Sequence, residues 1–451
     1  MRAVGRLTIT LLPALLAVGC VDRHALHDDR DVVVSAVHER TAREPSRPFI
    51  PESVNLADGL SEREAVQLAL RNNAAFQELL TDLGLAHADV IQAGLLTNPE
   101  LLYVFQTAPK PFKYAIDLPV EAIVLRPIRQ RAADAEWERT RERLTQAGLD
   151  LVRDTRLAHA DWVLARERVN IANENLKLRE RITALTEDRL KAGDATPLEV
   201  STAKIDSLRA RQEATRANND QPIFEERLRN LTGLGMSRPD LTPEPLDPPA
   251  EINRDVEALV ADAVAARPDV LAAEHAIVAA DERIRLAKLG WGRLLVIGDA
   301  TSGQNGHEFS PGFRVTIPIF NWNQGAIARA EVDRERFVRQ LQTVRERAIL
   351  DVRQAFAQHA QAAADYQQWM ADIRPAVELA VRRAENTYKE GGASLLLVLE
   401  TSRQLIDTRA REAQLRADLT RARAELERSV GHSVPAASGF AADRPAEPKK
   451  P

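Results

Sequence analysis

Two rows of apolar residues, each repeating every seven positions, run along residues 129–191 and constrain the packing of this stretch more than any other feature. The first row is Leu157, Leu164, Ile171, Leu178 and Leu185, and the second is Trp162, Val169, Leu176 and Leu190. A seven-residue repeat is typical of a coiled-coil seam. At about 100° per residue the rows lie roughly 140° apart, so the helix is expected to pack against neighbours on two sides.

The length of this stretch is a second constraint. About 60 helical residues at 1.5 Å each extend roughly 90 Å, a reach that few single-domain proteins need. A helix in a compact bundle buries one broad stripe, whereas two separate rows suit the wall of a tube with water on the remaining faces. We therefore interpret the stretch as part of a tube wall, and a helix buried in a large bundle is the alternative.

Three landmarks occur twice in the same order. Residues 68–73, 116–120 and 191–198 correspond to 263–268, 316–319 and 389–396 at offsets of about 194 to 199 residues. The landmarks differ in chemistry, since they are a helix, a strand-like piece and a helix break. Their near-constant offset predicts an internal duplication with repeats at 60–235 and 255–431.

Within each repeat the periodicity predicts the order helix, strand, strand, long helix, turn, helix. Strands are predicted at 99–106, 112–120, 292–302 and 311–320, and helices at 61–95, 129–191, 197–232, 325–389 and 395–430. The short segments are rich in aromatic and β-branched residues and are separated by prolines or glycines, as strands usually are. The predicted fold class is mainly α with a small β part, built from a duplicated helix-strand-strand-helix unit.

The first residues have the features of a secretory signal peptide. Two arginines precede an apolar run at 7–18 that is too short to be a spanning helix, so 1–19 is predicted to be a signal peptide. The run ends at Cys20, the only cysteine of the 451 residues. A small residue followed by cysteine resembles a bacterial lipobox, which implies cleavage before Cys20 and its lipidation. An ordinary signal with an incidental cysteine is the alternative.

Polar and proline-rich segments divide the rest of the chain. Residues 20–59 are predicted to be a flexible lead-in, 236–254 a proline-rich linker and 432–451 a disordered tail. After the signal, no stretch reaches the ~20 apolar residues that a helical membrane span requires.

Composition and motifs argue against several classes of function. The 61 basic and 66 acidic residues leave a net charge of −5, unlike the basic footprint of a nucleic-acid-binding protein. We find no phosphate-binding glycine loop, no nucleophile motif and no strong metal-ligand spacing, and His24 and His27 do not amount to a predicted metal site. We expect no catalytic residues, no cofactor and no enzymatic activity.

Four strands per chain cannot close a barrel, because open edges are not tolerated in lipid. Three chains would supply twelve strands. Membrane β-barrels have girdles of aromatic residues at the two membrane interfaces. Aromatic residues are concentrated in or beside the predicted strands, as such girdles would require. They are Tyr103, Phe105, Phe112, Tyr114, Trp291, Phe309, Phe313, Phe320 and Trp322. A pair of soluble β-hairpins is the alternative.

Over roughly residues 60–431 the sequence resembles the TolC-like outer-membrane efflux proteins. The matching pieces are 60–66 (LSEREAV), 93–100 (AGLLTNPE), 317–322 (IPIFNW) and 388–394 (YKEGGAS). The resemblance implies a homotrimer with a 12-stranded β-barrel in the outer-membrane lipid on a periplasmic α-barrel. It implies a periplasmic adaptor (membrane fusion protein) and an inner-membrane pump as partners, and small molecules or metal cations as cargo. The residues at 98–101 and 196–200 are more similar to the CzcC-like heavy-metal branch of the family.

The resemblance also implies a constriction at the periplasmic tips. By position, Glu199, Tyr388 and Glu400 correspond to residues of the periplasmic gate. A ring of three carboxylates there would favour cations. Leu397 and Ala393 stand where the family has a second gate acid and a latching arginine, so the resemblance implies a weaker or different latch.

Three glycines are predicted to form the helix-turn tips. Gly193, Gly391 and Gly392 lie where a helix must reverse its direction. Glycine adopts the positive φ that such a helix end commonly needs.

A periplasmic coiled-coil adaptor or scaffold lipoprotein without a pore is the alternative function. Such proteins also carry long helical hairpins and lipid anchors. They usually have one hairpin between β-rich halves, whereas this chain has two helical blocks and few strands. An enzyme is a more distant alternative.

Overall fold

The structure is a computed structural model that describes residues 59–104, 113–236, 238–246, 254–303, 306–389 and 395–435, together with Ser35 and Ile252. The predicted signal peptide, Cys20 and most of the predicted lead-in and tail lie outside the described residues. Gly391 and Gly392 also lie outside them.

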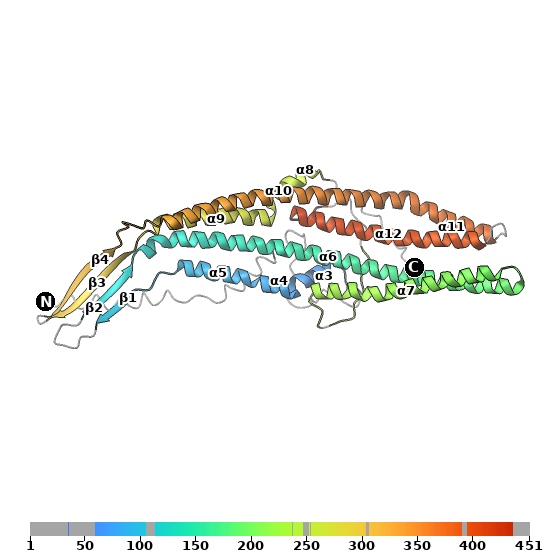
Figure 1. Ribbon diagram of the computed structural model, residues 1–451, viewed down its shortest axis with the longest axis horizontal. Coiled ribbons are helices and arrows are strands. Elements are labelled where there is room, and N and C mark those ends of the chain that lie inside the picture. The colour runs from blue at the N-terminus through green and yellow to red at the C-terminus, as the bar shows by residue number, and fades with distance from the viewer. Residues whose placement is uncertain are drawn as a thin grey trace, which may run out of the picture.

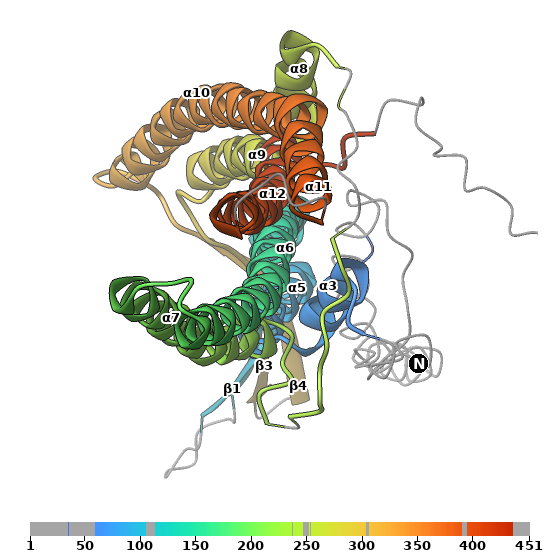
Figure 2. The ribbon, with the colours of Figure 1, turned by 90° about the vertical axis from the view of Figure 1, so that its right-hand side faces the viewer.

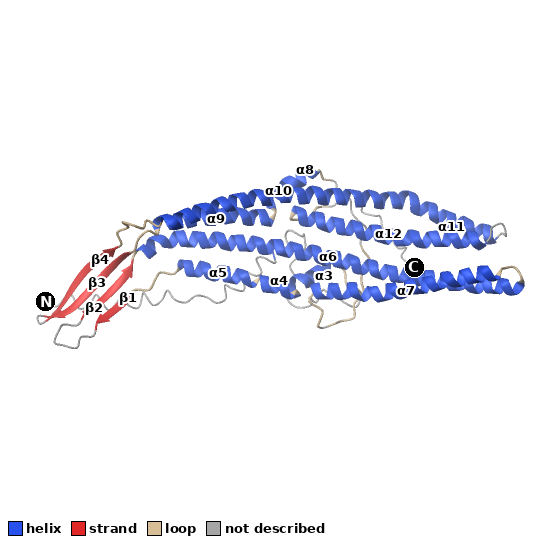
Figure 3. Cartoon of the chain, in the orientation of Figure 1, coloured by secondary structure: helices blue, strands red, loops and turns tan. Residues whose placement is uncertain are grey.

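The molecule is a long rod with a sheet at one end and two helical hairpins at the other (Figures 1 and 3). Helix α6 (Glu121–Ala192) contains 72 residues and extends about 108 Å at 1.5 Å per residue. Helix α7 (Pro197–Leu231) runs back along it. In the second hairpin α10 (Gln324–Gln368), the π-helical turn η1 (Trp369–Ile373) and α11 (Arg374–Lys389) run outward, and α12 (Leu395–Val430) returns. Within the described ranges, no helix combines the length and apolar character needed to cross a bilayer.

Both halves of the chain contain the same order of elements. The first half begins with α3 (Glu62–Asn72), α4 (Ala74–Leu79), α5 (Thr81–Gly94), β1 (Glu100–Val104) and β2 (Lys113–Pro119). The second begins with α8 (Val256–Ala266), α9 (Pro268–Leu289), β3 (Leu294–Gly303) and β4 (Gly306–Val315). In each half a long helical stretch and a returning helix follow, which agrees with the predicted order.

Two of the predicted helices are interrupted. The helix predicted at 61–95 is divided into α3, α4 and α5. The break between α3 and α4 occurs because Asn73 has an extended backbone and its side chain accepts a hydrogen bond from the Phe76 N–H at 2.9 Å. The helix predicted at 325–389 contains the π-helical turn η1. Pro375 follows this turn and has no backbone N–H to continue the α-helical ladder.

The strands form one antiparallel sheet in the order β1-β2-β3-β4, and the β2–β3 pair joins the two halves of the chain. The strand predicted at 311–320 is wrong at its C-terminal end, because β4 stops at Val315. Pro318 cannot donate to a ladder, and the Ile319 N–H donates to the Ile317 carbonyl at 3.0 Å in a tight turn. Residues 316–319, which correspond to residues 116–120 in the predicted duplication, are therefore not part of a strand.

Helix α6 has packing partners on two sides, as its two apolar rows predicted (Figure 2). Leu164 of the first row clusters with Ala413 of α12. Trp162 of the second row is fully buried in a cluster with Leu228 of α7. The first row ends earlier than predicted, because Leu185 lies near the tip and is 42% exposed.

Candidate functional site

The four-stranded sheet has one apolar face. The described side chains that share this face are Leu101, Tyr103, Tyr114, Ile116, Leu118, Leu294, Val296, Gly298, Ala300, Phe309, Pro311, Phe313 and Val315. They fall together because successive strand residues point to opposite sides and cross-strand partners point to the same side. Phe309 is 70% and Phe313 74% exposed, so the described chain leaves this face largely uncovered.

The opposite face carries every Asp, Glu, Lys and Arg of the described strands. Across it, Lys113 Nζ lies 3.4 Å from Asp299 Oδ2, and Arg314 Nη1 lies 3.4 Å from Asp117 Oδ2. A sheet with one apolar and one charged face is suited to a boundary between lipid and water.

Strands β1 and β4 are the two edges of this sheet. Each has a hydrogen-bonded neighbour on one side only in the described part of the chain. The unpaired N–H and C=O groups of an edge strand readily pair with a strand of another chain. The two edges are therefore the places where further strands can add.

Aromatic side chains accompany the strands, as predicted. The rings of Tyr103 and Tyr114 are cross-strand neighbours with centroids 5.2 Å apart. Trp322 follows β4 and is exposed. Phe105 and Phe112, which were part of the predicted girdle, lie outside the described residues.

At the other end of the rod, the first helix turn is built on Gly193, the C-cap of α6 (Figure 1). Its φ is +87°, in the left-handed region, and its N–H donates to the Leu190 carbonyl at 3.1 Å. A Cβ at this position would meet no atom within 4 Å. Backbone conformation, rather than lack of space, therefore favours glycine here.

Glu199 has a structural partner that the sequence reasoning missed. The Thr196 N–H donates to Glu199 Oε2 at 2.6 Å, and the Glu199 N–H donates to Thr196 Oγ1 at 3.3 Å, a capping box at the start of α7. The hydrogen bond from the Thr196 backbone lowers the pKa of Glu199 below its ordinary value. The spacing of Thr196 and Glu199 is the usual signal for such a box and was visible in the sequence.

The other predicted gate residues lie on the second hairpin. Tyr388 is in the last turn of α11, and its side chain is outside the described part. Glu400 is exposed on α12, and among the described residues no hydrogen bond or ion pair joins it to Glu199. The structure therefore places these residues at one end of the rod, on two hairpins, without bringing the two carboxylates into contact.

Groups of three or more potential metal ligands are absent from the part of the chain that the structure describes. His24 and His27 lie outside that part. The buried His159 has its Nε2 2.8 Å from the Leu60 carbonyl oxygen, so its described polar contact is to the backbone.

Comparison with known proteins identifies the class of protein that this fold defines. The family model for outer membrane efflux proteins matches residues 125–234 and 259–432, more than half of the chain. The chain belongs to the outer membrane efflux protein family, which is a non-enzymatic transport family.

Individual relatives agree with this assignment. The pyoverdine export outer membrane protein OpmQ of Pseudomonas putida is 27% identical over 294 residues, which are 62% of this chain and 60% of OpmQ. The match thus spans less than two thirds of that relative. The cobalt-zinc-cadmium resistance protein CzcC of Cupriavidus metallidurans is 25% identical over 412 residues, which are 85% of this chain and 92% of CzcC. The solved structure of CusC shares the fold, with a TM-score of 0.69 and 17% identity over 86% of this chain and 97% of that chain.

Proposed function

We propose that the protein is the outer-membrane channel component of a tripartite efflux system. It would serve as a passive conduit for small molecules or metal cations across the periplasm and the outer membrane. Family membership supports this proposal, and the structural observation that carries it is the division of the sheet into an apolar and a charged face. The apolar face would contact lipid and the charged face would line a water-filled interior.

The dimensions of the sheet support this reading. Strands β3 and β4 each contain 10 residues and extend about 33 Å at ~3.3 Å per residue. Tilted by about 45°, such strands rise roughly 23 Å, close to the ~25 Å apolar band of outer-membrane barrels.

We infer that three copies close the barrel. The β1 edge of one copy would pair with the β4 edge of the next, which gives twelve strands without an open edge. The helices of the three copies would form the α-barrel. The apolar side chains of Leu198, Ile205 and Leu208 on α7 are at least half exposed and offer a surface to the helices of a neighbouring copy.

The tips would be the periplasmic end. There a periplasmic adaptor and an inner-membrane pump would meet the helical hairpins, with Gly193, Gly391 and Gly392 at the turns. Glu199, Tyr388 and Glu400 would surround the constriction. In a trimer the Glu400 carboxylates would form a ring that favours cations.

The N-terminal features belong to the same proposal. Residues 1–19 would be removed as a signal peptide and Cys20 would carry the lipid that anchors the chain in the outer membrane. The two repeats, 60–235 and 255–431, would each contribute one helical hairpin to the α-barrel and two strands to the β-barrel. Replacing Cys20→Ser should abolish labelling with radioactive palmitate, and labelling that persists would overturn the lipid anchor.

Planar-bilayer conductance tests the central proposal. The purified full chain is expected to give discrete conductance steps and to migrate as a heat-labile trimer from outer-membrane fractions. A monomer in inner-membrane fractions without conductance would favour the adaptor or scaffold alternative instead.

A further inference from the structure

The β1–β2 hairpin and the β3–β4 hairpin resemble one another in sequence. Residues 101–104 (LLYV) in β1 correspond to 294–297 (LLVI) in β3. Residues 118–120 (LPV), where β2 ends, correspond to 317–319 (IPI), which follow β4. These matches align the two hairpins residue by residue. A slip of one residue is excluded, because it would exchange the apolar and charged faces.

The strand pairing confirms this alignment. The alignment equates the pair Leu101–Ile116 of the first hairpin with Leu294–Val315 of the second, and the structure contains both pairs. All four side chains lie on the apolar face of the sheet. The two hairpins therefore share one register as well as one sequence pattern.

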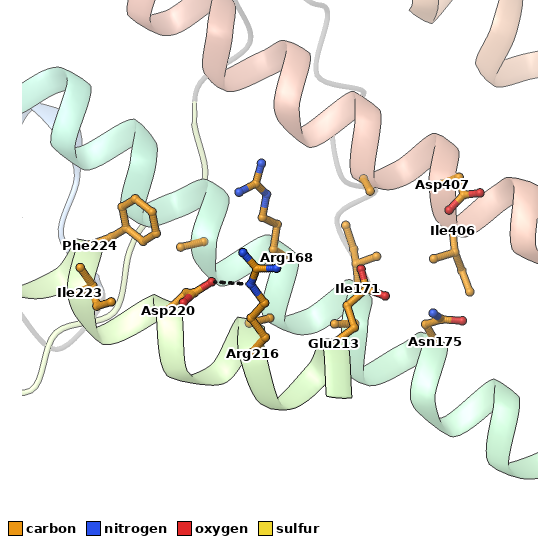
Figure 4. Close-up of a pocket in the computed structure, with 14 residues that line it drawn as sticks. Arg168, Ile171, Asn175, Glu213, Arg216, Asp220, Ile223, Phe224, Ile406 and Asp407 are labelled. Carbon is orange, nitrogen blue, oxygen red and sulfur yellow. Dashed lines mark ion pairs between the residues drawn. The ribbon is translucent and has the colours of Figure 1, made fainter. Parts of the chain in front are cut away.

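Each edge strand has an equivalent that is paired on both sides. Strand β4 corresponds to β2, and β1 corresponds to β3, while β2 and β3 pair with one another in the middle of the sheet. In the shaft, charged groups find partners within one copy, as Arg216 does with Asp220 at 3.7 Å (Figure 4). In the described chain the two edges β1 and β4 do not pair with each other. They therefore lack the pairing that their equivalents have.

The β2–β3 pairing shows what the edges need. Asp117 of β2 is opposite Ile297 of β3, and Pro119 is opposite Leu295. A proline at the end of this strand is thus compatible with pairing to the next strand. The internal junction between the two hairpins can therefore serve as a template for a junction between two copies.

The residues equivalent to 117–119 are 316–318, which follow β4. In the described chain no strand pairs with them. The Thr316 N–H donates to the Arg293 carbonyl at 3.1 Å on the side of β3, so the side toward a further strand remains open. The side chain of Ile317 is 72% exposed. This segment has the sequence of a strand end and lacks the neighbour that its equivalent has.

We propose that β4 and residues 316–318 of one copy pair with β1 of the next copy in the register that β2 has with β3. Thr316 of one copy is then opposite Val104 of the next, and Pro318 is opposite Leu102. This inference rests on the proposed trimer and specifies how its copies join. Even-numbered slips are the only competing registers, because an odd slip would turn the apolar face of one copy inward.

The register covers apolar surface that one copy leaves exposed. Ile317 lies opposite Tyr103 of the next copy on the apolar face, and a β-branched residue beside an aromatic one stabilises neighbouring strands. On the other face Leu102, which is 56% exposed in one copy, lies opposite Pro318. Pairing thus lengthens β4 by residues 316–318.

One backbone hydrogen bond changes its partner on assembly. In the single copy the Ile319 N–H donates to the Ile317 carbonyl at 3.0 Å. Its equivalent, the Val120 N–H, donates across the strands to the Leu294 carbonyl at 2.9 Å. In the assembled register the Ile319 N–H donates in the same way to the carbonyl of Leu101 of the next copy.

Disulfide cross-linking of the full chain in outer-membrane fractions tests the register. The double variants Thr316→Cys/Val104→Cys and Pro318→Cys/Leu102→Cys are in register and should give covalent trimers after oxidation, which a reductant reverses. The exchanged combinations Thr316→Cys/Leu102→Cys and Pro318→Cys/Val104→Cys are two residues out of register in opposite directions and should not cross-link. Directly opposite residues have Cα atoms about 4.5–5.5 Å apart, within disulfide range, whereas diagonal neighbours at about 7–8 Å are beyond it.

The four single variants are the controls, because Cys20 is the only native cysteine, and none should form covalent trimers. If a cysteine at Pro318 prevents assembly, the in-register pair Ile317→Cys/Tyr103→Cys on the apolar face gives the same decision. Cross-linking of an exchanged combination, or no cross-linking of the in-register pairs in a heat-labile trimer, would overturn the register and leave the conduit intact. Absence of a trimer of the unmodified chain would contradict the proposed function itself, and the register with it.

Discussion

The guanidinium of Arg156 on α6 joins the two halves of the chain through Glu427 on α12. Its Nη1 lies 2.5 Å from Glu427 Oε2, and its Nε lies 2.6 Å from Glu62 Oε1 of α3. The same antiparallel interface contains further pairs of an acid on α6 with an arginine on α12, among them Asp150–Arg428 at 2.7 Å and Glu174–Arg409 at 3.1 Å. The Arg156 pair is the buried one, and a buried charge needs both its partner and its hydrogen bonds.

Glu427→Gln should therefore destabilise the protein. Arg156 is 8% exposed and keeps Glu62 as a charged partner, so we expect the cost of weakening one buried charge-assisted contact, about 1–3 kcal/mol. Thermal melting followed by circular dichroism should show a transition lowered by several degrees. Glu174→Gln is the control, because its pair with Arg409 is more than half exposed and such pairs contribute about 0–1 kcal/mol. Equal effects of the two variants would contradict this assignment.

Acidification should destabilise the helical shaft through His159. Burial lowers the pKa of His159 below its ordinary value, although the Leu60 carbonyl and Glu62 act in the opposite direction. Below a pH of about 6.5 the unfolded chain binds the proton and the folded chain resists it, so stability falls as the pH drops through that value.

Melting temperatures between pH 8 and pH 5 measure this effect. His159→Gln retains a donor for the Leu60 carbonyl and removes the titration, so its melting temperature should depend less on pH. Burial also lowers the pKa of His359, and His359→Gln should flatten the remaining dependence. An unchanged slope in both variants would show that other groups control the acid response.

Gly193→Ala should destabilise the first tip. The left-handed conformation of Gly193, at φ +87°, costs an ordinary L-residue about 1–2 kcal/mol. Because a Cβ would meet no neighbour, the effect isolates backbone strain. Gly84→Ala, within α5 and equally free of neighbours, should stabilise by up to ~1 kcal/mol. Limited proteolysis at the tip reports the change at Gly193, and thermal melting reports the change at Gly84. A destabilising Gly84→Ala would indicate that space matters.

A new charge should disturb one face of the sheet and not the other. Phe313→Arg places a cation on the apolar face, where it costs about 2–4 kcal/mol at the middle of a bilayer. Ser310→Arg places the same side chain on the charged face of the same strand. Only Phe313→Arg should reduce the amount of heat-labile trimer recovered from outer membranes. Equal recovery of the two variants would contradict a lipid-facing surface.

Glu199 allows its capping role to be separated from its proposed gate role. Glu199→Gln retains the capping box, because glutamine also serves at this position, but removes the charge. Thr196→Ala removes the cap at a cost of about 1 kcal/mol and keeps the carboxylate. If Glu199 acts in the gate, the ratio of cation to anion permeability measured in planar bilayers should fall in Glu199→Gln and stay unchanged in Thr196→Ala.

Several parts of the fold could be predicted because their causes are local. The apolar rows through Leu164 and Trp162 indicated a helix with neighbours on two sides. The helix-breaking residues around Gly193 indicated where this helix ends. The break at Asn73 and the end of β4 at Val315 were missed. The break at Asn73 depends on one side-chain cap, and the end of β4 depends on the turn that follows it. Neither feature changes the apolar periodicity from which the elements were predicted.

By itself, the sequence determined the periodicities, and with them the long helices, the repeated order of elements and the aromatic character of the strands. Only the tertiary structure decided which elements are neighbours. The pairing of Ile116 with Gly298 aligned the β1–β2 and β3–β4 hairpins so that their charged residues share one face and their described aromatic residues the other, and the approach of α12 to α6 brought Glu427 to Arg156. These relationships could not be read from the chain, because they join residues far apart in sequence whose local patterns do not specify a partner.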